Sequence, residues 1–178
     1  MIFVPTTIEG CWIVKAERKQ DDRGYFARTW CRREFAEHGL NPDLAQCSVA
    51  YNRRKGTLRG MHFQKPPHAE CKLVRCTKGS VYDVVIDLRP DSRSFRRHFG
   101  YELSAPSCDA LYVPEGCAHG YLTLTRDTEL FYQMSEFYAP ESAAGVRWDD
   151  PAFDIQWPGP VRVISERDAG YAGFSVSA

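Results

Sequence analysis

Three side chains that can move a proton next to a carbonyl group lie close together in the sequence. Arg59 and His62 belong to the segment Gly-Thr-Leu-Arg-Gly-Met-His-Phe-Gln, residues 56–64, and Lys72 begins the next strand-like segment. An imidazole accepts a proton near neutral pH, a guanidinium suits a phosphate-sized anion, and an ammonium group stabilises an enolate oxygen. The set therefore predicts proton transfer beside a carbonyl, on a phosphorylated or nucleotide-linked substrate.

The composition is that of an ordinary globular protein. The chain has 178 residues, which suits a single domain over residues 1–178, and 43% of them are hydrophobic. Lys+Arg and Asp+Glu balance at 23 each, and no basic run is dense enough to predict a nucleic acid partner. The N-terminus lacks the layout of a signal peptide, and no apolar run approaches membrane-spanning length. We therefore expect a cytoplasmic protein that binds neither nucleic acid nor membrane.

The seven cysteines predict neither a disulfide framework nor a zinc site, because their number is odd and no Cys-x-x-Cys motif occurs. We expect reduced thiols that are mostly buried. Cys117 lies inside the motif Pro-Glu-Gly-Cys-Ala-His-Gly and is kept as a candidate reactive thiol.

Most of the chain reads as short strands separated by Gly, Pro, Asn and Asp, at the spacing typical of a sandwich or barrel. The strand-like segments are 72–76, 81–88, 98–103, 110–114, 120–124 and 128–134. A helix is predicted from Arg32 to His38, and the irregular tail after Trp157 is expected to carry a short helical end. These patterns predict an all-β fold, an antiparallel jelly-roll barrel (double-stranded β-helix) with a few short helices.

Strand alternation predicts which side chains share a face. The set from Tyr82 to Leu88, taken at every second residue, is apolar and is expected to face packed core. Asp83 lies on the opposite face of that strand. We expect Asp83 and Lys72 to point together into the barrel, where ionised groups need partners.

The segment Pro-Glu-Gly-Cys-Ala-His-Gly, residues 114–120, has the Pro-x-Gly-x-x-His pattern of cupin barrels, whose histidine, here His119, points inside. Metal-binding cupins also carry a His-x-His motif, and none occurs in this chain. His68 and Glu70 could complete a metal site with His62, but a Pro-Pro pair predicts a turn between them. A catalytic metal usually needs three protein ligands with matching geometry, and this turn separates the three candidates. We therefore expect no bound metal.

Together these motifs resemble the nucleotide-sugar 3,5-epimerases typified by dTDP-4-dehydrorhamnose 3,5-epimerase. The resemblance covers nearly the whole chain, through segments 22–26, 56–64, 72–76, 82–89, 103–104, 114–120, 132, 137–141, 145–151, 155–158 and 164–168. It implies an isomerase of deoxysugar and polysaccharide biosynthesis that inverts C3, C5 or both of a nucleotide-diphospho-4-keto-6-deoxyhexose. It also implies a homodimer and no cofactor.

The resemblance assigns a role to individual residues. His62 matches the catalytic base, Asp168 its orienting partner, Tyr132 the proton donor and Lys72 the cation beside the keto oxygen. Other positions match substrate-binding residues: Arg23, Phe26, Arg28, Gln46, Arg59, His119, Tyr138 and Arg167. Read by themselves, Asp168 could cap a terminal turn and Tyr132 could be an ordinary barrel aromatic.

The chain departs from the family pattern where the nucleotide base binds. Arg28 stands where the family usually has a Glu that accepts a hydrogen bond from thymine, Ala143 replaces a second Glu, and the run 46–50 loses an amide and a hydroxyl. Cytosine presents a bare N3 beside O2, which a donor such as Arg28 can satisfy. We therefore hypothesise a CDP-linked substrate, with dTDP and GDP as alternatives.

Three rival functions remain open at this point. The first is an epimerase that inverts a single centre, and the second is a nucleotide-sugar 3,4-ketoisomerase. The third is a non-catalytic cupin that only binds a sugar nucleotide. For the homodimer, we expect the segment with Arg23 and Phe26 to cross to a partner's sheet and complete its site.

Overall fold

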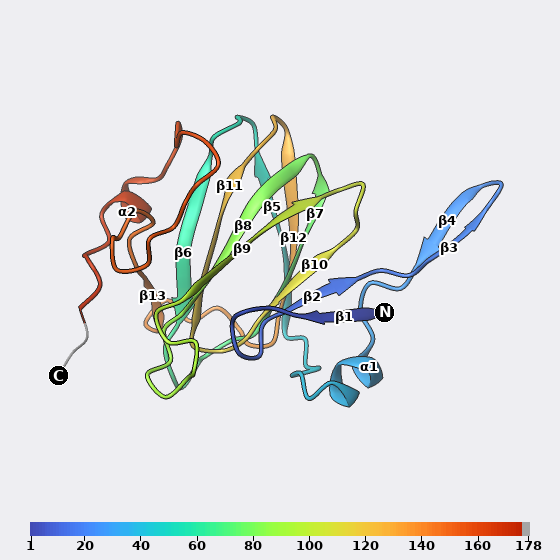
Figure 1. Cartoon of the computed structure of the whole chain (residues 1–178), viewed down its shortest axis with the longest axis horizontal. Coiled ribbons are helices and arrows are strands. Elements are labelled where there is room, and N and C mark those ends of the chain that lie inside the picture. Colours follow the sequence, from blue (N-terminus) through green and yellow to red (C-terminus); the bar gives the residue numbers. More distant parts are fainter. Residues whose placement is uncertain (176–178) are drawn as a thin grey trace.

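Two antiparallel sheets face each other and make up most of the structure (Figure 1), a computed structural model that describes residues 1–175. The six-stranded sheet runs in the order β1 (Ile2–Pro5), β2 (Trp12–Lys15), β10 (Ala110–Val113), β7 (Lys72–Lys78), β12 (Thr128–Met134) and β5 (Gln46–Asn52). The five-stranded sheet runs in the order β13 (Ala143–Gly145), β6 (Leu58–Gln64), β11 (Cys117–Thr123), β8 (Ser80–Asp87) and β9 (His98–Ser104). The predicted jelly-roll barrel is confirmed.

The remaining elements are a hairpin and two short helices. The hairpin joins β3 (Arg18–Asp21) to β4 (Gly24–Ala27), and the helices are α1 (Arg32–Glu37) and α2 (Glu166–Ala169). The predicted helix and all of the predicted strands are present. β11 begins at Cys117 rather than at the predicted Gly120, because its first residues pair with the end of β8.

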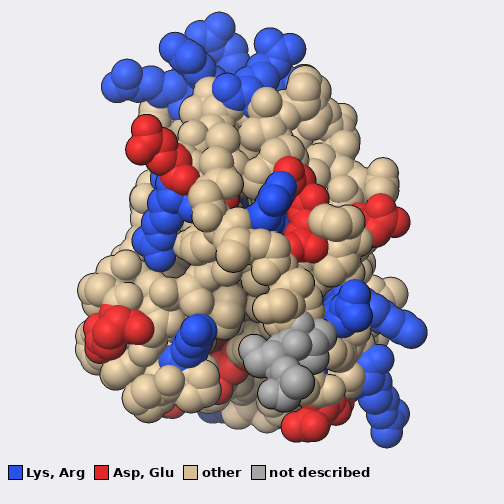
Figure 2. Space-filling model, turned by 90° about the vertical axis from the view of Figure 1, so that its left-hand side faces the viewer, with Lys and Arg blue, Asp and Glu red and all other residues tan. Residues whose placement is uncertain are grey.

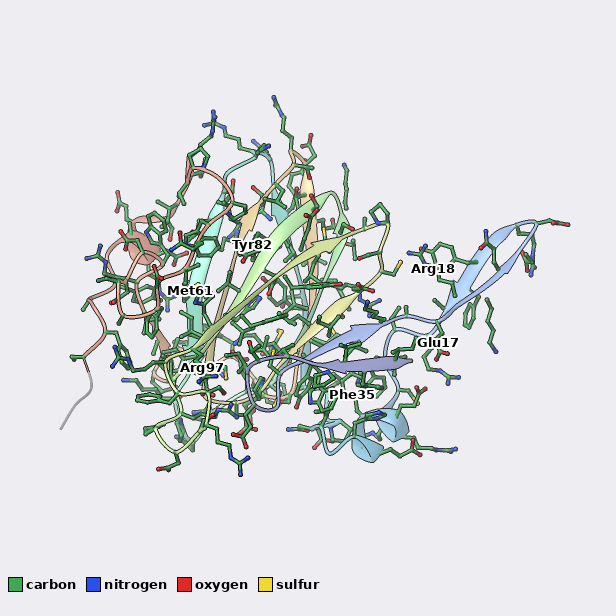
Figure 3. The ribbon with its side chains drawn as sticks, viewed as in Figure 1. Glu17, Arg18, Phe35, Met61, Tyr82 and Arg97 are labelled. Carbon is green, nitrogen blue, oxygen red and sulfur yellow. The ribbon has the colours of Figure 1, made fainter. Side chains whose placement is uncertain are left out.

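The alternation along β8 is confirmed and has a core on each side. Val81 and Val85 point between the two sheets and pack with Val74 and other residues of the interior. Val84 and its neighbour Ile86 point to the outer side of the five-stranded sheet and pack with Met61, Val146 and Phe153. The outer face of this sheet is therefore covered by the C-terminal part of the chain, on the side where Figure 3 labels Met61.

A bulge in β6 changes the direction of its side chains. Arg59 and His62 are three residues apart, so regular alternation would place them on opposite faces. The pairing with β11 shifts register between His119, opposite His62, and Tyr121, opposite Arg59. Tyr121 belongs to the interior cluster, and both Arg59 and His62 therefore face the interior, as a bulge permits.

The bulge requires glycine on both strands. Gly60 has φ +145, and a Cβ there would lie 2.6 Å from the Cα of Gly120. A Cβ on Gly120 would in turn lie 2.9 Å from the Cα of Gly60. The two backbones approach so closely that no side chain fits between them.

The C-terminal segment is held against the beginning of β6. Leu58 N–H donates to the carbonyl of Val163 at 2.8 Å, and Arg162 N–H donates to the carbonyl of Gly56 at 2.8 Å. α2 follows directly, and its Ser165 N-cap oxygen accepts a hydrogen bond from Asp168 N–H at 3.1 Å. This pairing places α2 beside β6, in agreement with Figure 1.

The β3–β4 hairpin extends away from the two sheets as an arm (Figure 1). Glu17 and Arg18 lie at its base (Figure 3), where Arg18 donates a hydrogen bond to the carbonyl of Pro106 and Tyr25 Oη lies 2.9 Å from Cys108 Sγ. The Phe26 side chain on this arm is 74% exposed. In this single chain, the arm has an apolar surface without a packing partner among the described residues.

The cysteines are free thiols, and Cys11, Cys71, Cys76 and Cys117 are buried. Burial raises the pKa of the Cys117 thiol far above its usual value. Cys117 is therefore a protonated core residue, and the interpretation as a reactive thiol is wrong. Within residues 1–175, none of the helices has the length and apolar character needed to span a bilayer.

Candidate active site

His62 and Asp168 form a hydrogen-bonded pair although they are 106 residues apart in the sequence. His62 Nε2 lies 2.8 Å from Asp168 Oδ1, and Gly60 N–H donates to Asp168 Oδ2 at 3.2 Å. The Asp168 carboxylate is buried, whereas the His62 side chain is 41% exposed. One end of the imidazole is thus held by a buried carboxylate, and the rest of the ring is accessible.

The surroundings of Asp168 determine which imidazole nitrogen carries the proton. Burial acts to raise the pKa of Asp168, but the hydrogen bond from His62 and the N–H of Gly60 outweigh it, so that the pKa lies below its ordinary value. Asp168 is therefore ionised at neutral pH and can only accept. The neutral imidazole must then carry its hydrogen on Nε2, which leaves Nδ1 as the nitrogen that can take up a proton.

A second His–Asp pair lies beside the first one. His119 is directly opposite His62 in the β6–β11 ladder, and its Nε2 lies 2.8 Å from Asp83 Oδ1. Both residues of this pair are buried, and within residues 1–175 Asp83 Oδ2 has no hydrogen-bond partner. Burial raises the pKa of Asp83, although the charge and hydrogen bond of His119 act against it.

Tyr132 faces the same interior from the opposite sheet. It lies on β12 and packs against the interior cluster, and its ring meets the ring of His119 edge to face, with centroids 5.8 Å apart. Burial above all, and then the neighbouring Tyr121 and Asp83, raise the pKa of Tyr132 well above its ordinary value. Its hydroxyl therefore stays protonated through the neutral and mildly alkaline range, which suits a proton donor.

Lys72 is buried at the start of β7, with 9% of its surface exposed. It shares a strand face with the interior residues Val74 and Cys76. Its Nζ lies 2.7 Å from Oε1 of Glu70, which is the ionic partner that a buried ammonium group needs. The prediction that Lys72 and Asp83 both point into the barrel is confirmed.

Arg59 is held at the edge of the interior by β5. Its Nε donates to Asn52 Oδ1 at 2.9 Å, and Asn52 Nδ2 donates to Tyr121 Oη at 3.1 Å. Sequence reasoning missed Asn52 and Tyr121, because neither belongs to a segment with recognisable chemistry. No signal in the sequence identifies them, because the burial of Asn52 beside the basic turn 53–55 follows only from the structure.

Three further predicted residues lie near α2 and the start of β5. Gln46 Oε1 accepts a hydrogen bond from Tyr138 N–H at 2.5 Å, and Arg167 Nε donates to Tyr171 Oη at 3.1 Å. The hydrogen bonds with Tyr138 and then Tyr171 raise the pKa of Arg167. The Tyr138 side chain is exposed, so its ring is open to a ligand.

The other three predicted residues do not join this group within the chain. Arg23 and Phe26 lie on the hairpin arm and Arg28 follows it, on the opposite side of the molecule from α2 and β6 (Figure 1). Arg23 pairs with Asp21, and Arg28 pairs with Glu34 at 3.2 Å. Within one chain, these three residues therefore lie apart from the His62–Asp168 pair.

Lys and Arg side chains gather at one end of the barrel, at the top of Figure 2. A depression there is lined by Arg54, Lys55, Arg126, Arg162 and Val163, and an adjoining one includes Arg59. Within residues 1–175, no group of three or more His, Cys, Asp or Glu side chains is arranged to hold a metal ion. His68 and Glu70 instead contact Ser142 and Lys72.

Comparison with known proteins gives a consistent result. The family model described as dTDP-4-dehydrorhamnose 3,5-epimerase matches residues 5–175. The chain is 40% identical to dTDP-4-dehydrorhamnose 3,5-epimerase of Escherichia coli, over 89% of this chain and 85% of that protein.

Solved structures agree. The enzyme of the same name from Elizabethkingia anophelis has a TM-score of 0.95 and 37% identity, covering 98% of this chain and 96% of that chain. ChmJ, a 3'-monoepimerase from Streptomyces bikiniensis in complex with dTDP-quinovose, has a TM-score of 0.88 and 32% identity, covering 95% and 86%.

The His62–Asp168 pair makes stability depend on pH in a defined direction. Because the pKa of Asp168 in the folded state lies below its ordinary value of 3.8, the ionised carboxylate stabilises the fold above that pH. The stabilisation is lost as the pH falls through the lowered pKa. We expect Asp168→Asn to reduce the free energy of unfolding by about 1–2 kcal/mol at pH 6 and by less at pH 3, below the ordinary pKa of 3.8, as measured by urea denaturation.

Asp91→Asn serves as the control, because Asp91 is exposed and should leave the free energy of unfolding unchanged at both pH values. A difference between wild type and Asp168→Asn that is equally large at pH 6 and pH 3 would contradict the expectation.

Proposed function

The chain belongs to the dTDP-4-dehydrorhamnose 3,5-epimerase family and is an epimerase, and we propose that it inverts C3, C5 or both of a nucleotide-diphospho-4-keto-6-deoxyhexose. The observation that carries the proposal is the opposed placement of a base and an acid. His62, oriented by Asp168, lies on β6 of one sheet, and Tyr132 lies on β12 of the other. A sugar ring bound between the sheets presents one face to each residue.

The first step is removal of a proton from a carbon next to the C4 carbonyl. Nδ1 of His62 takes the proton, and the electron pair of the C–H bond moves into the carbonyl to form an enolate. Asp168 stabilises the resulting imidazolium without taking its proton. The ammonium group of Lys72 stabilises the enolate oxygen, an effect worth about 3 kcal/mol for one well-placed donor in a dry site.

The second step returns a proton to the opposite face of the same carbon. The enolate collapses to the ketone as its carbon takes the proton of the Tyr132 hydroxyl, and the configuration is inverted. Tyr132 then regains a proton from solvent and His62 releases one, so that both side chains return to their starting state. Every transfer in this scheme is between side chains, substrate and solvent.

The relatives differ in how many carbon centres they invert. The E. coli relative is a 3,5-epimerase by name, whereas ChmJ is a 3'-monoepimerase. We favour inversion at both centres, because the family model that matches this chain is described as a 3,5-epimerase. The ketoisomerase and the non-catalytic alternatives are not supported by these relatives.

Deuterium exchange in heavy water tests the scheme, with dTDP-4-keto-6-deoxyglucose as substrate. His62→Asn should lose both exchange and product formation by at least about 100-fold, since the base begins the reaction. Tyr132→Phe should still exchange deuterium at carbon but form little inverted product, because it lacks only the acid. NMR of the sugar protons measures exchange at C3 and C5 separately, and unchanged turnover in His62→Asn would overturn the scheme.

For the nucleotide we propose dTDP. ChmJ was solved with dTDP-quinovose, and the guanidinium of Arg28, which suggested cytosine, already donates to Glu34. The CDP hypothesis needs the Arg28 guanidinium to donate to cytosine, and this guanidinium is already paired with Glu34. CDP stays the alternative, because a nucleotide could compete with Glu34 for this exposed side chain.

Calorimetric titration with dTDP, CDP and GDP distinguishes these nucleotides. We expect dTDP to bind at least about tenfold more tightly than CDP, a difference of about 1.4 kcal/mol. Arg28→Gln should change dTDP affinity little if Glu34 keeps the guanidinium away from the base. Tighter binding of CDP, lost in Arg28→Gln, would reverse the assignment.

We also propose a homodimer in which the arm of each chain lies on β5 of the other. β5 is an edge strand that pairs only with β12 within residues 1–175, and its Val49 side chain is exposed. Unpaired edges attract strands, and the arm offers Phe26 as an apolar contact. Since β5 begins at Gln46, such pairing would bring Arg23 and Arg28 toward the partner's Tyr138.

Light scattering after gel filtration tests this arrangement. Wild type should elute as a dimer, and Phe26→Glu should weaken association at least tenfold, because it buries a charge against the partner. Ile2→Glu is the matched control: Ile2 is an exposed apolar residue on β1, the other edge of the same sheet. Monomers in Ile2→Glu and dimers in Phe26→Glu would assign the interface to the wrong edge.

A further inference from the structure

Tyr171 lies next to His62, although none of the functional motifs includes it. It follows α2, three residues after Asp168. Its ring meets the imidazole of His62 edge to face, with centroids 6.1 Å apart and an interplanar angle of 66°. In the part of the chain that the structure describes, no other aromatic ring packs against the imidazole of His62.

Two contacts hold the Tyr171 ring in place. Its hydroxyl accepts a hydrogen bond from Arg167 Nε at 3.1 Å. Its ring lies on the bare backbone of Gly145, where a Cβ would come within 2.3 Å of Tyr171 Cζ. Gly145 pairs with His62 in the β13–β6 ladder, so the ring is seated directly beside the strand position that carries the imidazole.

The imidazole needs such a second contact. The hydrogen bond to Asp168 fixes the position of Nε2, but a single bond at one atom leaves the ring free to tilt about it. The direction of Nδ1 depends on that tilt. A displacement of about 1 Å in a reacting group can cost about 100-fold in rate, and the His62 side chain is open to solvent on part of its surface.

We propose that Tyr171 is a positioning residue, whose ring fixes the plane of the His62 imidazole and so directs Nδ1 at the substrate carbon. The proposal rests on the proposed function of His62 as the base. It also gives α2 a combined role. Asp168 sets the tautomer of the imidazole, while the ring of Tyr171 on the same short segment sets its orientation. A ring contact suits this purpose because it restricts tilt without forming a hydrogen bond to Nδ1, which stays free to take up the substrate proton.

A purely structural role for Tyr171 makes different predictions. The ring also lines an apolar depression together with Phe63, Val146 and Phe174, and it could serve only to attach the C-terminal segment. In that case its removal would lower the fraction of folded protein, and the enzyme that stays folded would react as wild type. A positioning role requires that the folded variant itself react more slowly.

Three variants separate these roles. Tyr171→Ala should lower kcat about 10- to 100-fold and change KM by less than about threefold. Tyr171→Phe keeps the ring and loses the bond from Arg167, and it should retain kcat within about threefold. Phe174→Ala is the control, because Phe174 lines the same depression but packs on Phe95 and Phe153 rather than on His62; its kcat should match wild type.

The kinetic isotope effect provides a readout that folding does not influence. With substrate deuterated at C3 and C5, the effect on kcat should increase in Tyr171→Ala, because a misdirected base makes proton removal slower relative to the other steps. An unchanged isotope effect, or a kcat equal to that of Phe174→Ala, overturns the proposal for Tyr171. If His62→Asn is inactive in the same assay, His62 remains the proposed base even when the proposal for Tyr171 is overturned. If His62→Asn is active, the proposed function itself is wrong.

Discussion

One register shift in β6 decides where the charged groups of this barrel point. Without it, Arg59 and His62 would lie on opposite sides of the five-stranded sheet, one in the interior and one under the C-terminal segment. The shift exists because Gly60 and Gly120 approach to a distance that excludes any Cβ. The close approach of two backbones thus places Arg59 and His62 on the same face of the sheet.

The second constraint is the need to pair every charge that the barrel buries. Asp168 is held by His62 and Gly60, Asp83 by His119, and Lys72 by Glu70. The His62–Asp168 pair is also the arrangement that the proposed proton transfer needs, because the ionised carboxylate of Asp168 fixes the tautomer of His62. Tyr132 is the complementary case: burial keeps its hydroxyl neutral, and a neutral hydroxyl can donate. The pairing and burial that stabilise this interior therefore also provide the protonation states that the proposed proton transfer needs.

The elements that carry these groups differ in how they are anchored. His62, His119 and Tyr132 lie on strands within the sheets, whereas Asp168 and Tyr171 lie on a short C-terminal segment attached by backbone hydrogen bonds near Gly56. The hairpin arm lies outside both sheets and presents its apolar side chain to solvent. The proposed dimer would complete the site with that arm, so the nucleotide end depends on a second chain while the proton-transfer end does not.

Local patterns in the sequence were enough for the strands β7 to β12, the helix from Arg32 and the inward direction of Lys72 and Asp83, because alternation is a property of neighbouring residues. The histidine motifs and the resemblance to a family also pointed to His62 and His119.

The tertiary structure alone decided the rest. Alternation by itself would have separated Arg59 from His62. The resemblance named Asp168 as the partner of His62, but no local pattern explains how it reaches a residue 106 positions away. The orienting roles of Asn52 for Arg59 and of Tyr171 for His62 were likewise invisible in the sequence. The physical reason is that contacts between distant segments depend on strand register and on the path of the C-terminal segment. Both are set by the close packing of two glycine backbones and by pairing across the whole chain.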